Sequence, residues 1–402
     1  MNRRTMTKTL LAAFASGTLV SRNAAAQTPE AASAITLVDV PGVALALSPD
    51  GTMVAGVADR EVLCVWDVES FEPIAQSKPL PELGIIDDAS VVWSPDNSAV
   101  AWSLQAARLL RDSDIYVFDI ASATITNLTG EGGHEDAASL LEVQATPGAV
   151  LDVDTFPGWS ADGSDILFAR SPWGGDTPRE SRLMRIPRDG GEASEVALLS
   201  DANVLLVSGP LFPFDDGSVL YGTWPPQPDS PEQGVFMVTP DGEVESISSG
   251  MLASDTPAMM LTSAAPHARK ASAVSLQNLG QFTPDKPIWI ELDLDTGIGT
   301  PFEEVLSLPE SGDAYPLVAA PAFLTGADGM LTGYGYATRG EDSGTYDLWT
   351  RALESDGPDR LGTVEDIGSR GEGILQVPRV VAVDAGTIGF LFLGNLWIAN
   401  IG

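Results

Sequence analysis

The residue types that most often carry chemistry are few and scattered in this chain. Its 402 residues include two histidines, His134 and His267, and one cysteine, Cys64. A serine–histidine–aspartate triad would need a presented serine, but no G-x-S-x-G turn occurs. Two histidines and one cysteine also leave few nitrogen or sulfur ligands for zinc or copper. We therefore expect no catalytic residue and no metal ligand among them: His134 lies in a polar linker, and His267 and Cys64 serve the structure.

Paired carboxylates are the next candidates. Asp152 and Asp154 form one pair, and Asp293 and Asp295 form another. Hard cations such as Ca²⁺ take several oxygen ligands, but neither pair matches the D-x-[DN]-x-[DN]-G loop. We expect these acids to cap turns and predict no cofactor, with Ca²⁺ or Mg²⁺ binding as the alternative. Glycosidase chemistry would need two carboxylates at a fixed separation across a pocket, which spacing along the chain does not reveal.

Aromatic and basic side chains in polar segments between apolar runs are candidates for binding. The set comprises Trp173, Arg179, Trp224, Phe282 and Arg339. Aromatic rings offer flat apolar contact and guanidinium groups donate paired hydrogen bonds. Together they suit an anionic or carbohydrate-like ligand, or a protein surface. Plain solvated loops are the alternative interpretation.

Acidic residues outnumber basic ones by 56 to 21, for a formal net charge of −35. Such a surface repels the phosphate backbone of nucleic acids and anionic membrane surfaces, so we expect neither as a partner. The simplest explanation of the charge is solubility, since net charge says little about fold.

Residues 1–26 have the pattern of an export signal. Arg3 and Arg4 precede a short apolar run over 10–20, and the alanines at 24–26 offer a cleavage site before Gln27. The arginine pair resembles a twin-arginine signal, with an ordinary secretory signal as the alternative. The apolar run is shorter than the roughly 20 residues that span a bilayer. We therefore predict an exported mature chain, extracellular, at the cell surface or periplasmic, without a transmembrane segment.

The elements that must position the candidate side chains repeat about every fifty residues. A turn motif marks the repeats: Ser-Pro-Asp-Gly at 48–51, Ser-Pro-Asp-Asn at 94–97, Ser-Ala-Asp-Gly at 160–163 and Phe-Asp-Asp-Gly at 214–217. Proline presets the turn, aspartate caps it and glycine adopts the conformation that a Cβ resists. Apolar runs of strand length flank each turn, and two further strands follow. The pattern predicts an all-β, single-domain, seven-bladed β-propeller over residues 27–402, built of four-stranded antiparallel blades.

The chain's two ends predict how the ring closes. The last unit has only three strands, over 380–383, 387–392 and 396–401. A spare alternating strand over 34–40 precedes the first full unit. Pairing these ends removes an exposed edge, which favours seven blades over six. Tryptophans on the predicted strands are expected to pack between blades; they are Trp66, Trp93, Trp102, Trp159, Trp289, Trp349 and Trp397.

The turn motif, Asp-Ile-Tyr-Val-Phe-Asp at 114–119 and Asp-Leu-Trp at 347–349 together resemble the TolB-type propeller repeat, a relative of the WD-repeat blade. The resemblance covers residues 35–402 and implies architecture. Such blades occur in the periplasmic TolB protein, in prolyl-oligopeptidase-like enzymes and in some sugar-acid lyases. TolB carries an α/β domain before its propeller, for which residues 27–35 leave no room. The lyases use clustered histidines on a metal, which this chain lacks.

In a four-stranded meander, the loops between the second and third strands share one face with the connections between blades. These loops are long in blades two to six and contain the five binding candidates. Rigid scaffolds commonly carry function on such loops. We predict a non-catalytic module that binds a protein or carbohydrate partner through this face. The alternative is an enzyme, such as a lyase, lactonase or glycan hydrolase, that uses carboxylates at the mouth of the channel with or without a divalent cation.

Overall fold

The structure is a computed structural model in which the chain divides into two units, residues 1–32 and 33–402. All described residues belong to the second unit. They are 35–58, 62–79, 84–86, 91–106, 113–130, 150–174, 180–200, 206–207, 209–224, 234–247, 259–275, 288–308, 317–326, 330–368, 379–383 and 386–401.

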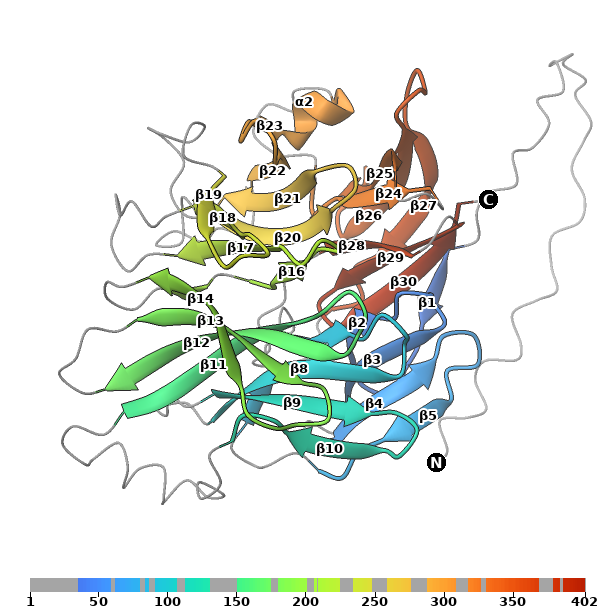
Figure 1. Cartoon of the computed structure of the whole chain (residues 1–402). Helices are drawn as coiled ribbons and strands as arrows, with labels where there is room; N and C mark the ends of the chain where they lie inside the picture. Colours follow the sequence, from blue (N-terminus) through green and yellow to red (C-terminus); the bar gives the residue numbers. More distant parts are fainter. Residues whose placement is uncertain are drawn as a thin grey trace, which may run out of the picture. The chain divides into compact units, whose positions relative to one another are not determined.

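The described residues of this unit form seven successive antiparallel meanders, which we call blades 1 to 7 (Figure 1). Blade 1 contains β2 (Val43–Leu47), β3 (Met53–Ala58), β4 (Val62–Asp67) and β5 (Pro73–Gln76). Blade 2 contains β6 (Gly84–Ile86), β7 (Val92–Trp93), β8 (Ala99–Ala106), β9 (Ser113–Asp119) and β10 (Thr124–Asn127). Blade 3 contains β11 (Val150–Trp159), β12 (Asp165–Gly174), β13 (Ser181–Pro187) and β14 (Ser194–Ser200).

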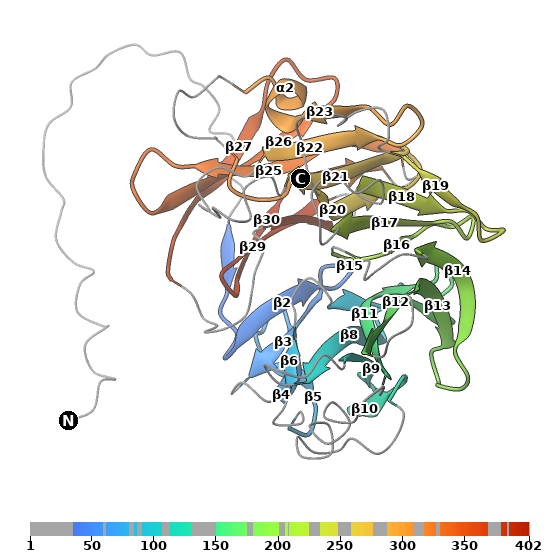
Figure 2. The same cartoon turned by 90° about the vertical axis from the view of Figure 1, so that its left-hand side faces the viewer.

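Blades 4 to 7 follow in the same order (Figure 2). Blade 4 contains β15 (Leu206–Val207), β16 (Phe212–Pro213), β17 (Val219–Trp224), β18 (Gly234–Val238) and β19 (Val244–Ser246), and blade 5 contains β20 (Met259–Ala265), β21 (Lys270–Ser275), β22 (Ile288–Asp293), β23 (Gly299–Pro301) and the short helix α2 (Phe302–Leu306). Blade 6 contains β24 (Ala322–Thr325), β25 (Leu331–Arg339), β26 (Thr345–Ala352) and β27 (Asp359–Glu365). Blade 7 contains β28 (Arg379–Val383), β29 (Thr387–Phe392), β30 (Asn395–Asn400) and β1 (Thr36–Val38).

The predicted pairing of the two chain ends is confirmed. β1 pairs antiparallel with β30, so the sheet order in blade 7 is β1-β30-β29-β28. In each blade, the first or second strand contacts the first strand of the next blade. The first strand of blade 1, β2, also contacts β29 and β30 of blade 7. Blades 2 and 3 are also joined by a parallel bridge between Ser113 and Val153. The blades therefore form a closed series.

The repeated turns form as their sequence predicts. The Ser48 hydroxyl donates to Asp50 Oδ1 (2.7 Å), and the Thr52 backbone N–H donates to the same oxygen (3.0 Å). The same arrangement recurs in blades 2 and 3, from Ser94 and Ser98 to Asp96 and from Ser160 and Ser164 to Asp162. Gly51 has φ 72°, a left-handed conformation that favours glycine. The aspartate thus replaces water as the acceptor for groups the turn leaves unpaired.

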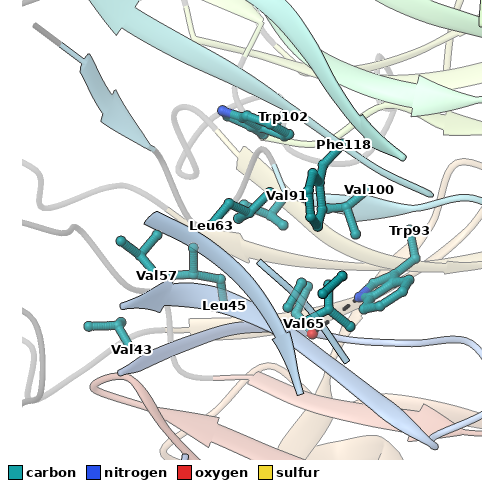
Figure 3. Close-up of a cluster of buried hydrophobic side chains, with 13 residues drawn as sticks. Val43, Leu45, Val57, Leu63, Val65, Val91, Trp93, Val100, Trp102 and Phe118 are labelled. Atoms are coloured by element: carbon teal, nitrogen blue, oxygen red, sulfur yellow. Dashed lines mark hydrogen bonds between the residues drawn. The ribbon is translucent and has the colours of Figure 1, made fainter. Parts of the chain in front are cut away.

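The hydrophobic core lies between neighbouring blades. Figure 3 shows the cluster between blades 1 and 2, where Leu45 and Val65 face Val100 and Phe118. Two tryptophans link neighbouring blades through hydrogen bonds of their indole N–H groups. Trp93 Nε1 of blade 2 donates to the Ala46 carbonyl of blade 1 (3.2 Å), and Trp159 Nε1 of blade 3 donates to Val92 of blade 2 (3.2 Å). The other strand tryptophans lie in similar clusters: Trp66, Trp102, Trp289, Trp349 and Trp397.

Candidate functional site

The two ends of the blades differ in what their polar groups do. We call the end with the second-to-third strand loops and the blade connections the loop face, and the opposite end the turn face. On the turn face, Arg188 links blade 3 to blade 2: its Nη1 lies 3.3 Å from Asp96 Oδ2 and its Nη2 donates to Ser98 Oγ (2.7 Å). Its guanidinium also stacks 5.4 Å from the Trp159 ring.

Carboxylates of the turn face are held by local hydrogen bonds. The hydroxyl of Ser94 and then that of Ser98 donate to Asp96, and they hold its pKa well below the ordinary value. The backbone and hydroxyl of Ser164 and the hydroxyl of Ser160 lower the pKa of Asp162 to about 2. Further turn aspartates with lowered pKa values are Asp50, Asp67, Asp119, Asp216 and Asp293. These acids stabilise turns and remain ionised at neutral pH.

In blade 3, the ends of β11 and β12 that lie away from their connecting turn extend far toward the loop face. β11 and β12 each have 10 residues, and their pairing reaches Leu151 opposite Trp173 and Val150 opposite Gly174. The next strand, β13, pairs with β12 only as far as Arg170 opposite Arg182. The end of β12 therefore extends past its outer neighbour, and Figure 1 shows this hairpin reaching beyond the strands beside it.

A buried ion pair holds this hairpin at its base. Arg170 Nε and Nη2 donate to the two oxygens of Asp154, each at 2.7 Å, while Arg170 Nη1 lies 3.3 Å from Asp152 Oδ2. The Asp154 side chain is 2% exposed. Burial raises the pKa of Asp154 to about 6, against the lowering influence of Arg170 and of the Thr129 hydroxyl. The prediction that Asp152 and Asp154 cap a turn is therefore wrong, because both lie in β11, where Asp154 is opposite Arg170 and Asp152 contacts the same arginine.

The geometry of Asp154 suits support rather than proton transfer. A general acid or base must reach the substrate, directly or through one water. Both Asp154 oxygens accept from Arg170, and its side chain is almost fully buried. Bidentate Arg–carboxylate pairs fix direction as well as distance. The pair therefore orients the strands that carry Trp173 and the start of β11.

The other predicted carboxylate pair behaves as expected in part. Asp293 Oδ1 accepts from the Thr296 backbone (2.9 Å) and hydroxyl (2.7 Å), which is turn capping. Asp295 instead accepts from Arg269 Nε at 3.0 Å. His267 Nε2 lies 3.4 Å from Asp215 Oδ2 of the neighbouring blade's turn, and Cys64 is buried. Among the described residues, no three His, Cys, Asp or Glu side chains gather in a way that could hold a metal ion.

The structure places three of the five binding candidates. Trp173, Trp224 and Arg339 are at the loop-face ends of β12, β17 and β25, so the prediction that they lie in loops is wrong: the strands run further because neighbouring strands continue beside them. Arg339 ends β25 on the same face and is exposed. Trp173 and Trp224 belong to adjacent blades, and Arg339 is two blades beyond Trp224. Arg179 and Phe282 lie outside the described residues.

Sequence inspection missed a polar cluster inside the seam between blades 5 and 6. Tyr334 Oη of β25 donates to Glu291 Oε2 of β22 at 2.6 Å, and Lys270 Nζ pairs with the other Glu291 oxygen. Glu291 is 7% exposed. A charged residue at an inward position of an apolar strand was the available signal, but its partners come from another strand and another blade.

Comparison with solved structures identifies the architecture. An oligogalacturonate lyase in complex with manganese matches with a TM-score of 0.54 at 14% identity, over 92% of this chain and 91% of that one. An oligogalacturonate lyase from Vibrio parahaemolyticus matches with a TM-score of 0.54 at 15% identity, over the same shares. The WD40 repeats of RRP9 match with a TM-score of 0.52 at 11% identity, over 93% of this chain and 99% of that one.

The fold is a seven-bladed β-propeller. At these identities the likeness shows the fold alone, and the propellers that match include both a lyase and a WD40 protein. No protein-family model matches the chain, and no curated protein matches it. Within the described residues, no helix has the length and apolar character needed to cross a membrane.

Proposed function

We propose that this propeller is a non-catalytic recognition module that binds a protein or carbohydrate partner on its loop face. The observation that carries the proposal is the buried Asp154–Arg170 pair at the base of the β11–β12 hairpin. Binding sites need a rigid base whose own side chains are locked. A bidentate, buried ion pair supplies that rigidity on β12, three residues before Trp173.

The two faces carry different kinds of side chains, and this difference supports the same function. Turn-face carboxylates satisfy backbone and hydroxyl donors of their own turns, so they are committed to structure. The loop face instead carries the ends of the long hairpins, with Trp173 in blade 3, Trp224 in blade 4 and Arg339 in blade 6. Aromatic and arginine side chains are the types most enriched at binding hot spots.

The setting proposed for this activity is outside the cytoplasm. The pattern of residues 1–26 supports a signal peptide, twin-arginine or secretory, with the mature chain extracellular, at the cell surface or periplasmic. The blade motif supports a TolB-type repeat as the finer relationship. The net charge of −35 supports a partner other than nucleic acid.

The test is a binding screen followed by matched variants. The chain is screened against a glycan array and a panel of exported proteins, and each hit is measured again with Trp173→Ala, Trp224→Ala and Arg339→Glu. Ile74→Ala is the control, because Ile74 is 48% exposed on the outer strand of blade 1, away from the loop ends. We expect at least one loop-face variant to weaken the affinity about tenfold or more, as loss of a hot spot does. Hits that bind all four variants equally would reject the loop face.

A further inference from the structure

Two strands, β22 of blade 5 and β25 of blade 6, each direct alternate side chains into the seam between these blades. Glu291 on β22 accepts the Tyr334 hydroxyl of β25, which shows that both residues point into the seam. Side chains two positions apart along a strand share a face. Trp289 therefore points into the seam beside Glu291, and Tyr336 points into it beside Tyr334; both belong to the buried cluster of this seam.

Strand direction places Trp289 and Tyr336 at the same level. β22 runs from the loop face to the turn face, so Trp289 is nearer the loop face than Glu291. β25 runs the other way, so Tyr336 is nearer the loop face than Tyr334. The Glu291–Tyr334 bond thus forms a floor, and Trp289 and Tyr336 lie one step above it, toward the loops.

Both groups above the floor lack a hydrogen-bond partner. Trp289 Nε1 and Tyr336 Oη are buried and unpaired within the described part of the chain, and the side chains are 2% and 1% exposed. Native proteins rarely leave buried polar groups unpaired, so each such group calls for an explanation. Neighbouring Trp349 differs, because its Nε1 donates to Thr338 Oγ1 at 2.8 Å.

The chemistry of the two unpaired groups selects the atom that would satisfy them. The indole N–H only donates, and the phenol donates its hydrogen. A single acceptor oxygen can receive both. A carbonyl oxygen brings two lone pairs and no hydrogen, whereas a water or sugar hydroxyl brings hydrogens that need acceptors in turn. Charge favours a neutral acceptor, because the charges around the site are balanced: Glu291 below is paired with Lys270, and the two charged side chains that act on Tyr336, Arg351 and Asp359, have opposite signs.

We propose that the loop-side end of the blade 5–6 seam is a subsite for a main-chain carbonyl of a peptide, held by Trp289 Nε1–H and Tyr336 Oη–H. This inference rests on the proposed recognition function and assigns a partner class to it. Apolar side chains of the same cluster suit the carbonyl's neighbouring aliphatic side chain; they include Val274, Leu306, Leu317 and Phe323. A sugar would leave its other hydroxyls without partners there. Because both donors are covered, binding parts the blades at this end, as an induced fit.

The experiment follows the indole N–H of Trp289 directly. Protein labelled with ¹⁵N-tryptophan has nine indole signals, and Trp289→Phe identifies the one that belongs to Trp289. N-acetyl-L-leucinamide is titrated to about 50 mM, since so small a ligand binds at about millimolar Kd at best. We expect a saturable shift of the Trp289 signal, while the signal of Trp66, between blades 1 and 7, stays fixed.

The variants and a second probe decide the outcome. Tyr336→Phe keeps the ring and removes one donor, so we expect it to weaken the probe's Kd about three- to tenfold. An unshifted Trp289 signal, or an unchanged Kd in Tyr336→Phe, would overturn the subsite. A stronger response to N-acetylglucosamine than to N-acetyl-L-leucinamide would overturn the peptide assignment. The subsite can fail while the recognition function stands: a partner that binds Trp289→Phe normally but not Trp173→Ala or Arg339→Glu rejects the subsite and retains the loop face.

Discussion

Leu37 of β1 lies opposite Trp397 of β30, so a strand near the start of the chain completes a sheet formed near its end. The seam beyond this pair is apolar: Val38 is 1% exposed and packs in the cluster that joins blade 7 to blade 1. The closing strand has only three residues. Its contribution must therefore come from this packing as much as from its few backbone hydrogen bonds.

We predict that Val38→Asp lowers the free energy of unfolding by about 3 kcal/mol, because it buries an unpaired charge in an apolar cluster. Thr36→Asp is the matched control, since Thr36 is exposed on the same strand, and it should change stability by less than about 0.5 kcal/mol. Urea denaturation followed by tryptophan fluorescence measures both. Equal effects of the two variants would mean that β1 does not close the ring in solution.

The architecture was predictable because its signals are local and repeated. In the Ser-x-Asp turns, the donors and the acceptor are close in sequence: Ser48, Asp50 and Thr52 are within five residues of one another. The pairing of the spare N-terminal strand with the three-stranded last unit followed from counting strands. The site was harder to predict from the sequence, because its contacts join residues that are distant along the chain. Asp154 lies 16 residues from Arg170, and Glu291 lies 43 residues from Tyr334 in another blade. Alternation places such residues on a face but does not name the opposite strand's partner.

The link between blades 2 and 3 makes Arg188 a second test of the fold. We predict that Arg188→Ala lowers stability by about 1–2 kcal/mol, because it removes two charge-assisted contacts and the stacking on Trp159. Arg188→Lys should recover less than half of this loss, since an ammonium keeps the charge but not the planar stack. Arg185→Ala is the control: Arg185 is 46% exposed and 3.8 Å from Asp165, and exposed pairs contribute about 0–1 kcal/mol.

The two tyrosines of the blade 5–6 seam should respond in opposite ways to loss of their hydroxyls. Tyr334 donates to the buried Glu291 carboxylate, so Tyr334→Phe removes a hydrogen bond to a charged group and should destabilise by about 1.5–3 kcal/mol. The Tyr336 hydroxyl is unpaired, so Tyr336→Phe should leave stability unchanged or raise it by up to about 1 kcal/mol. Thermal unfolding of the two variants, without ligand, measures the contrast. A large loss in Tyr336→Phe would show that its hydroxyl is satisfied in the free protein.

The free energy of unfolding at acidic pH should depend on pH in opposite ways for the turn aspartate Asp162 and the buried Asp154. Asp162 has its pKa lowered to about 2 from 3.8, so it stabilises the folded state above pH 3.8 and loses that contribution as the pH falls toward 2. We predict that Asp162→Asn is less stable than the wild type at neutral pH and that the difference shrinks below pH 3.8. Urea unfolding across this range measures it; a difference that stays constant would contradict the assigned cause.

Asp154 should show the opposite sign. Its pKa is raised from 3.8 to about 6, so between these values the folded state holds more of the Asp154 proton than the unfolded state does. Wild-type stability therefore falls as the pH rises through this window. Asp154→Asn lacks that titration while keeping a polar partner for Arg170, so its stability relative to the wild type should rise from pH 3.8 to 6. Urea unfolding at several pH values measures the difference. Parallel profiles would mean that the pKa of Asp154 is the same in the folded and unfolded states, so that Arg170 offsets the effect of burial in full.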